Sequence, residues 1–121
     1  MIQDNTVINL LESAMRAEGL RQQAIATNVA NMNTEGYRRI DVNFEIELRK
    51  AMDKKGDDIN PDKVEMEFYQ TKNTPVNEQG SDVSLDTELG KMVENSLRHR
   101  AYMSLLKKKY QQMDSAIKLQ Y

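Results

Sequence analysis

The residues best suited to chemistry in this chain are a single histidine and a run of aspartates. His99 is the only histidine among the 121 residues, and it stands between Arg98 and Arg100. A catalytic histidine needs a nucleophile and an orienting acid that converge on it, and neighbouring cations disfavour its protonated form. A polar position in a helix seam, which helps to set helix register, explains His99 better. The sequence therefore predicts no catalytic residue.

The aspartates could bind calcium only if their spacing matched a known loop. The cluster consists of Asp53, Asp57, Asp58 and Asp62. An EF-hand loop needs Asp or Asn at its first, third and fifth places and glycine at the sixth. Counted from Asp53, Lys55 falls third and Gly56 fourth, so the pattern fails and indicates a solvated linker. The chain has no cysteine, which excludes disulfides and cysteine-based zinc sites. We expect no metal and no cofactor.

The basic residues and the methionines also have simpler explanations than a binding site. Arg98, Arg100 and the lysines at 107–109 suggest a phosphate stripe, but acidic residues outnumber basic ones by 19 to 17. Few aromatic side chains are present for base stacking, so we expect no nucleic-acid partner. Several of the eight methionines lie on a helix seam, where packing explains them. The sequence indicates a protein that is not an enzyme.

The composition favours a small domain that is marginally stable alone. Hydrophobic residues make up 39% and charged residues 30%, and the mean hydropathy is −0.74. Burial has to offset about 1–2 kcal/mol of backbone entropy per ordered residue. We expect one domain over residues 1–121 that orders against neighbouring copies. No apolar stretch is long enough to insert into a membrane, and the first residues lack the features of a cleavable signal, so export would need another route.

The N-terminal segment, residues 4–32, is predicted to be a long amphipathic helix. Its apolar stripe steps by threes and fours through Val7, Leu10, Ala14, Ala17 and Ala24. Asparagine and glycine in residues 31–37 tolerate the left-handed conformation that ends a helix. We expect Gly36 to adopt it.

The middle segment, residues 33–84, is polar and expected to be flexible and partly disordered. Phe44, Leu48 and Met52 predict a short helix over residues 42–52. Val64, Met66 and Phe68 alternate with polar residues and predict a short strand.

The C-terminal segment, residues 85–120, has the strongest periodicity. Apolar residues alternate steps of four and three along it, as in a coiled-coil seam: Leu85, Leu89, Met92, Met103, Leu106, Tyr110, Met113 and Ile117. Ser96 and His99 are its two polar members. The simplest partner for this seam is the N-terminal helix, and copies of the chain would cover what remains exposed. The predicted fold is mainly α, an antiparallel α-hairpin or coiled coil of two long terminal helices.

Residues 26–39, Ala-Thr-Asn-Val-Ala-Asn-Met-Asn-Thr-Glu-Gly-Tyr-Arg-Arg, closely resemble the signature of the flagellar rod and hook proteins. Glu35 stands where many members carry proline. The matching positions are Asn28, Ala30, Asn31, Asn33, Thr34, Gly36 and Tyr37. Residues 82–89 and 95–102 are also similar to that family, whereas the middle segment matches poorly. For the asparagines, simple capping and a contact with a neighbouring subunit are equally open.

The resemblance implies a self-assembling structural subunit of the proximal rod of the bacterial flagellum, built into a helical tube that links the MS ring to the distal rod. It implies as partners copies of the chain, other rod proteins, the MS-ring protein with its adaptor, and the flagellar type III export apparatus. It also implies a position in the periplasmic rod. A sister rod protein and a stand-alone coiled-coil adaptor or chaperone remain alternatives.

Overall fold

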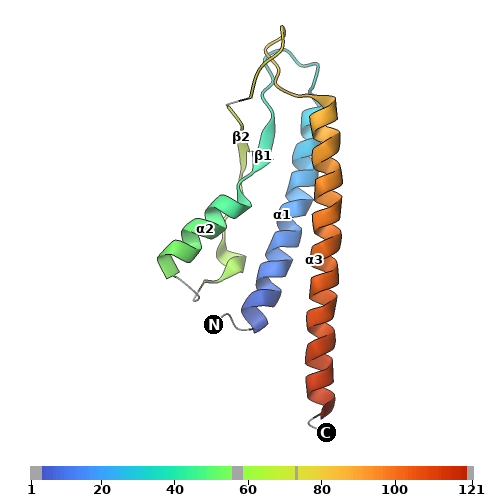
Figure 1. Cartoon of the computed structure of the whole chain (residues 1–121). Helices are drawn as coiled ribbons and strands as arrows, with labels where there is room; N and C mark the ends of the chain where they lie inside the picture. Colours follow the sequence, from blue (N-terminus) through green and yellow to red (C-terminus); the bar gives the residue numbers. More distant parts are fainter. Residues whose placement is uncertain (1–3, 56–58, 73, 120–121) are drawn as a thin grey trace.

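The computed structural model describes residues 4–55, 59–72 and 74–119 and consists mainly of two long helices. The elements run α1 (Asp4–Ala30), β1 (Ile40–Val42), α2 (Phe44–Lys55), the 3-10 helix η2 (Pro61–Lys63), β2 (Phe68–Gln70) and α3 (Leu85–Leu119). Figure 1 shows α1 and α3 side by side and antiparallel, which confirms the predicted hairpin. Asp57 and Asp58 of the aspartate cluster, and residue 120 of the predicted helix, lie outside the described residues. None of the described helices is long and apolar enough to cross a membrane.

The middle segment forms a small arm beside the hairpin. β1 and β2 pair antiparallel, with Asp41 opposite Tyr69, and α2 follows β1 directly (Figure 1). The predicted short helix is present as α2. The predicted strand is confirmed only at its end, because β2 begins at Phe68. The sequence does not predict β1, since three residues are too few to establish an alternating pattern.

The hydrophobic core lies between α1 and this arm. It consists of Ala14 and Ala17 from α1 with Val42, Phe44 and Val64 from the middle segment. The alanines allow close approach, and the larger side chains come from the arm. The middle segment thus supplies most of the apolar volume that α1 buries, although its sequence is polar.

The contact between α1 and α3 differs from the predicted one. Six of the eight seam residues, namely Leu85, Leu89, Met92, Met103, Tyr110 and Ile117, are 40–56% exposed, while Leu106 and Met113 are half-buried. The side of α3 that meets α1 instead carries Glu88, Asn95 and Tyr102, seven residues apart. The prediction that the seam packs against the N-terminal helix therefore holds only in its later part, where Leu106 is half-buried and the Tyr110 hydroxyl donates to Glu12 of α1 at 3.2 Å. A leucine in place of Glu88 would remove the buried acceptor of Arg39 and of the Asn28 amide, and a leucine in place of Asn95 would remove a buried donor to Glu18; both losses are costly.

Candidate assembly interface

Asn28 is the centre of the turn that follows α1. Its side-chain amide donates to the carbonyl oxygen of Ile40 at 2.9 Å, and its Oδ1 accepts from the Ile40 N–H at 2.9 Å. The amide also donates to Glu88 Oε2 at 3.2 Å, and the Tyr37 hydroxyl donates to Asn28 Oδ1 at 2.9 Å. Asn28 is fully buried. One side chain therefore joins α1, β1 and α3.

The other residues of the motif shape the turn or face solvent. The Asn31 side chain donates to the Thr27 carbonyl at 2.9 Å, and the Thr34 hydroxyl bonds Asn31 Oδ1 at 3.3 Å. Ala30 and Asn33 are exposed. Asn31 thus caps the end of the helix, and Asn33 is placed on the surface.

Gly36 has the left-handed conformation that the sequence predicts. Its φ is +73°, and its N–H donates to the Gln79 carbonyl at 2.9 Å. Gly80, with φ +80°, lies against it, so that a Cβ on Gly80 would stand 3.5 Å from the Gly36 Cα. This contact brings residues 76–80 onto the turn.

Replacing Gly36 with valine should lower the free energy of unfolding by at least about 1–2 kcal/mol, because a β-branched residue is strained at this φ. Gly19→Ala is the matched control: Gly19 lies within α1, no other part of the fold comes within 4 Å of the place a Cβ would occupy, and alanine should stabilise the helix by about 0.5–1 kcal/mol. Urea unfolding followed by circular dichroism measures both. Equal effects of the two variants would contradict the strained turn.

A buried carboxylate, Glu18, fixes α3 against the middle of α1. Asn95 donates to the Glu18 carbonyl and to its Oε2, both at 2.7 Å. Arg21 and Arg98 both donate to Glu18 Oε1, at 2.7 and 2.8 Å. Burial alone would lower the pKa of Arg21, but contacts with Glu45 and Glu18 outweigh it and raise that pKa. The carboxylate is fully buried and its charge is matched by cations, as a buried ion requires.

A second buried carboxylate, Glu88, holds the start of α3 to Arg39, the residue before β1. Arg39 Nε donates to Glu88 Oε1 at 2.8 Å, and both side chains are buried. Burial, followed by the negative charges of Glu88 and Asp82, raises the pKa of Tyr37. This shift favours the protonated hydroxyl, which donates the hydrogen bond to Asn28 Oδ1.

Asp82 ties the loop before α3 to Arg39, the residue before β1, and to the segment after β2. It accepts from the Arg39 N–H at 2.5 Å and from the Thr74 hydroxyl at 2.6 Å. Burial alone would raise the pKa of Asp82, but these bonds and the charge of Arg38 hold it below its ordinary value of 3.8. The unfolded chain therefore binds this proton more readily, and the stabilisation by Asp82 is lost as the pH falls below about 3.8.

Asp82→Asn should cost about 1.5–3 kcal/mol of unfolding free energy at pH 7, because the bonds to a charged acceptor are weakened. The difference from the unmodified chain should shrink in urea titrations repeated as the pH falls below 3.8. A difference that stays constant down to about pH 2 would show that the charge of Asp82 does not matter.

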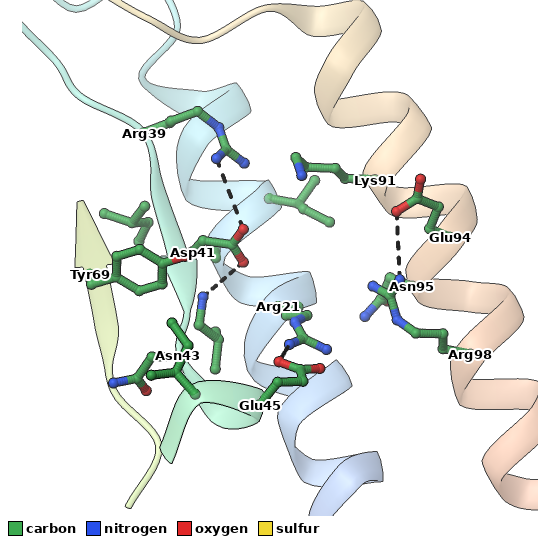
Figure 2. A pocket seen from close by; sticks show the side chains of 15 residues that line it. Arg21, Arg39, Asp41, Asn43, Glu45, Tyr69, Lys91, Glu94, Asn95 and Arg98 are labelled. Atoms are coloured by element: carbon green, nitrogen blue, oxygen red, sulfur yellow. Dashed lines mark hydrogen bonds and ion pairs between the residues drawn. The ribbon is translucent and has the colours of Figure 1, made fainter. Parts of the chain in front are cut away.

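Beside this network a cleft of about 280 Å³ opens between the arm and α3. Figure 2 shows Asp41, Asn43 and Tyr69 on the side of the arm, with Glu94, Asn95 and Arg98 on the side of α3. Arg21 pairs with Glu45, and Arg39 is 4.0 Å from Asp41. These opposite charges neutralise one another, which is the chemistry of structural ion pairs.

Neither His99 nor the described part of the aspartate cluster joins the network of Glu18, Glu88 and Asp82 as a reactive group. His99 is half-buried and lines a separate cleft with Gly19, Gln22 and Met103. Within residues 4–55, 59–72 and 74–119, no three His, Cys, Asp or Glu side chains gather as metal ligands would.

The exposed seam forms an apolar stripe along α3 that Ser96 and His99 interrupt near its middle. Leu85, Leu89, Met92, Met103, Tyr110 and Ile117 recur at steps that keep them on one side of a helix with 3.6 residues per turn. We call these six residues the α3 stripe. The stripe runs beside the α1 contact, and near its far end Met15 of α1, Met103, Leu106 and Tyr110 line a largely apolar groove. Exposed apolar stripes of this kind mark interaction surfaces.

Comparison with known proteins shows which family this chain resembles. A family model described as "Flagella basal body rod protein" matches residues 8–38. The flagellar basal body rod protein FlgB of Buchnera aphidicola from Acyrthosiphon pisum is 26% identical over 127 residues, covering 94% of this chain and 96% of that protein. FlgB of Escherichia coli is 25% identical over 120 residues, covering 84% and 86%. The chain is related to the flagellar basal body rod proteins.

A third rod protein, from another organism, is similar to this chain over a shorter stretch. FlgB of Borreliella burgdorferi is 28% identical over 102 residues, covering 66% of this chain and 72% of that protein. The stretch that matches the rod-protein model runs through most of α1 and its turn to residue 38. It contains Glu18, Asn28 and Gly36, which position α3 and the loop before it.

The sequence does not predict the buried ion pairs that Glu18 and Glu88 form in this chain. From the sequence, Glu88 is expected to lie at a helix N-terminus, where the helix dipole favours a negative charge. Arg21 is expected on the solvated face of the first helix. A signal is nevertheless present: Glu18 follows Ala14 by four residues on the small-residue stripe of α1, and Glu88 and Asn95 precede Tyr102 at intervals of seven. Polar residues at core spacing indicate partners across the helix pair.

Proposed function

We propose that this chain is a structural, non-catalytic subunit of the flagellar basal-body rod and that it assembles through α3. The observation that carries the proposal is the α3 stripe, six large side chains that are 40–56% exposed along one side of the helix. Covering each of them would contribute on the order of 1 kcal/mol, because each still has about half of its surface to bury. Neighbouring subunits of an assembly supply such cover. The similarity of this chain to flagellar rod proteins supports the rod as that assembly.

The finer assignment is the proximal rod, within the periplasm. Subunits would build a helical tube with their terminal helices inward, linking the MS ring to the distal rod. The partners would be copies of the chain, other rod proteins, and the MS-ring protein with its adaptor. The flagellar export apparatus would deliver the chain unfolded. The thin core between α1 and the arm supports this route, because few buried apolar side chains have to be exposed to unfold it.

Deleting the gene tests the proposal. The expected result is a non-motile strain whose basal bodies, isolated and viewed by electron microscopy, stop at the MS ring, and an intact copy of the gene should restore both rods and swimming. Complete rods and normal swimming in the deletion strain would refute the proposal. A soluble adaptor or chaperone would instead leave some rods assembled, with the protein absent from purified basal bodies.

A further inference from the structure

Hydrogen bonds within the small sheet of the arm leave one edge of β2 open. In an antiparallel pair of strands, every second residue bonds across to its partner, and the residues between them point their N–H and C=O groups outward. The bond from the Thr71 N–H to the Arg39 carbonyl sets this alternation. Tyr69 therefore bonds inward to β1, whereas Phe68 and Gln70 point their backbone groups away from it.

The matching edge of β1 is covered within the chain. The Ile40 N–H donates to Asn28 Oδ1, and the Ile40 carbonyl accepts from the Asn28 side-chain amide, both at 2.9 Å. Val42, the next outward residue of β1, donates its N–H to Asp41 Oδ1 at 2.8 Å. Asn28 thus bonds β1 as a third strand would. In the part of the chain that the structure describes, no group bonds the outward N–H and C=O groups of β2.

The open edge of β2 also exposes apolar side chains. Phe68 and Tyr69 are 46% and 40% exposed, and the strand contains neither lysine nor proline, two residues that protect sheet edges from pairing. Figure 1 shows β1 between β2 and α1, so that β2 lies on the outer side of the arm. A hollow of about 410 Å³ opens beside the end of the strand and is lined by Tyr69, Gln70, Thr71, Lys72 and Thr74. Outward backbone groups at every second residue are matched by an extended backbone.

We propose that β2 binds an extended segment of another polypeptide, which joins the arm as a third strand. Bonds to the backbone of Phe68 and Gln70 hold this segment, and a β-branched or aromatic side chain opposite Phe68 pairs with it across the strands. The segment belongs to a different protein, because an array of copies would need each β2 to meet a free edge of β1, which Asn28 occupies. This inference goes beyond the proposed function, which concerns the α3 stripe.

Gln70→Pro tests the backbone contact in the full-length chain. Proline removes an outward N–H and leaves the bonds between β1 and β2 in place, as at other edge strands. Gln70→Ala is the matched control, since it shortens the same side chain and keeps the N–H. Urea unfolding followed by circular dichroism should give similar midpoints for the two variants, which shows that both are folded.

Photo-crosslinking in living cells measures the contact itself. A photoreactive phenylalanine derivative at Phe68 should join a peptide of another protein, identified by mass spectrometry. Adding Gln70→Pro should lower the yield of this product about tenfold or more, because one bond is lost and the ring occupies the place of the partner strand. Adding Gln70→Ala should leave the yield unchanged. The same derivative at Met52, which is 42% exposed on α2, is the control position and should give little of the product.

The crosslink from Phe68 in the otherwise unmodified chain identifies the partner without the proline variant. A probe that joins nothing, or that joins only peptides of this chain, overturns the proposal, and the second result would indicate a closed β2–β2 pair of copies. Equal yields from Gln70→Pro and Gln70→Ala overturn it as well, because the contact would then be made by side chains. None of these results affects the rod assignment, which the gene deletion tests.

Discussion

Replacing Glu88 with alanine should lower the free energy of unfolding by about 3–5 kcal/mol, because Arg39 would keep its charge in a buried site without its partner. The side chains of Glu88 and Arg39 are 0% and 6% exposed. The variant would also remove the bond that Asn28 donates to Glu88 Oε2. Since domains of this size have only about 5–15 kcal/mol of stability, this loss would remove a large share of it. Thermal and urea unfolding followed by circular dichroism measure the loss.

Two further variants distinguish the loss of the buried ion pair from the effect of shortening a glutamate side chain. Glu94, like Glu88, pairs with an arginine, but its side chain is 65% exposed. Glu94→Ala should therefore cost less than about 1 kcal/mol of unfolding free energy. The double variant Glu88→Leu with Arg39→Met should be more stable than Glu88→Leu alone, since neither buried charge is then left unpaired. A Glu88→Ala variant as stable as Glu94→Ala would contradict the buried pair.

Leu89→Asp should abolish rod assembly and swimming while leaving the isolated subunit folded. Leu89 is 45% exposed, so the monomer should lose only about 1 kcal/mol of stability, the contribution of about half a buried leucine side chain. In an assembled rod the same carboxylate would have to lose its water without gaining a partner, which costs several kcal/mol at every copy. Swimming in soft agar and electron microscopy of basal bodies measure assembly, and circular dichroism of the purified variant measures folding.

Ser104→Asp is the matched control for this prediction. Ser104 is exposed on the same helix, more than a quarter of a turn from Met103 of the stripe, and its neighbours at helical spacing are Arg100, Lys107 and Lys108. The strain carrying Ser104→Asp should swim normally. If both variants swim, or if neither does, the α3 stripe is not the specific assembly surface.

The long helices can be predicted well because their apolar periods are long and their ends carry strong signals. α1 and α3 end within two residues of their predicted limits, and Gly36 has the φ that the motif predicts. Resemblance in the stretch around Asn28 and Gly36 also indicates the family, which composition and periodicity alone could not have identified.

The partner of each helix face is harder to predict, because periodicity describes one helix and packing depends on two. The leucine and methionine series on α3 is the strongest pattern in the chain, yet Glu88 and Asn95 occupy the contact with α1. Their partners, Asn28 and the Glu18 backbone and carboxylate, are 60 and 77 residues away in sequence. Nothing local in the sequence shows that these polar groups meet, and the apolar seam is left exposed as a result.

Photo-crosslinking inside assembled basal bodies tests most directly whether the α3 stripe is covered by neighbouring subunits. A photoreactive amino acid would replace Met103 of the stripe, or Ser104 as the control, in a strain that still swims. Irradiation should join Met103 variants covalently to another polypeptide of the basal body and should leave Ser104 variants largely uncoupled. Coupling from Ser104 with none from Met103 would contradict the assembly surface derived from the structure.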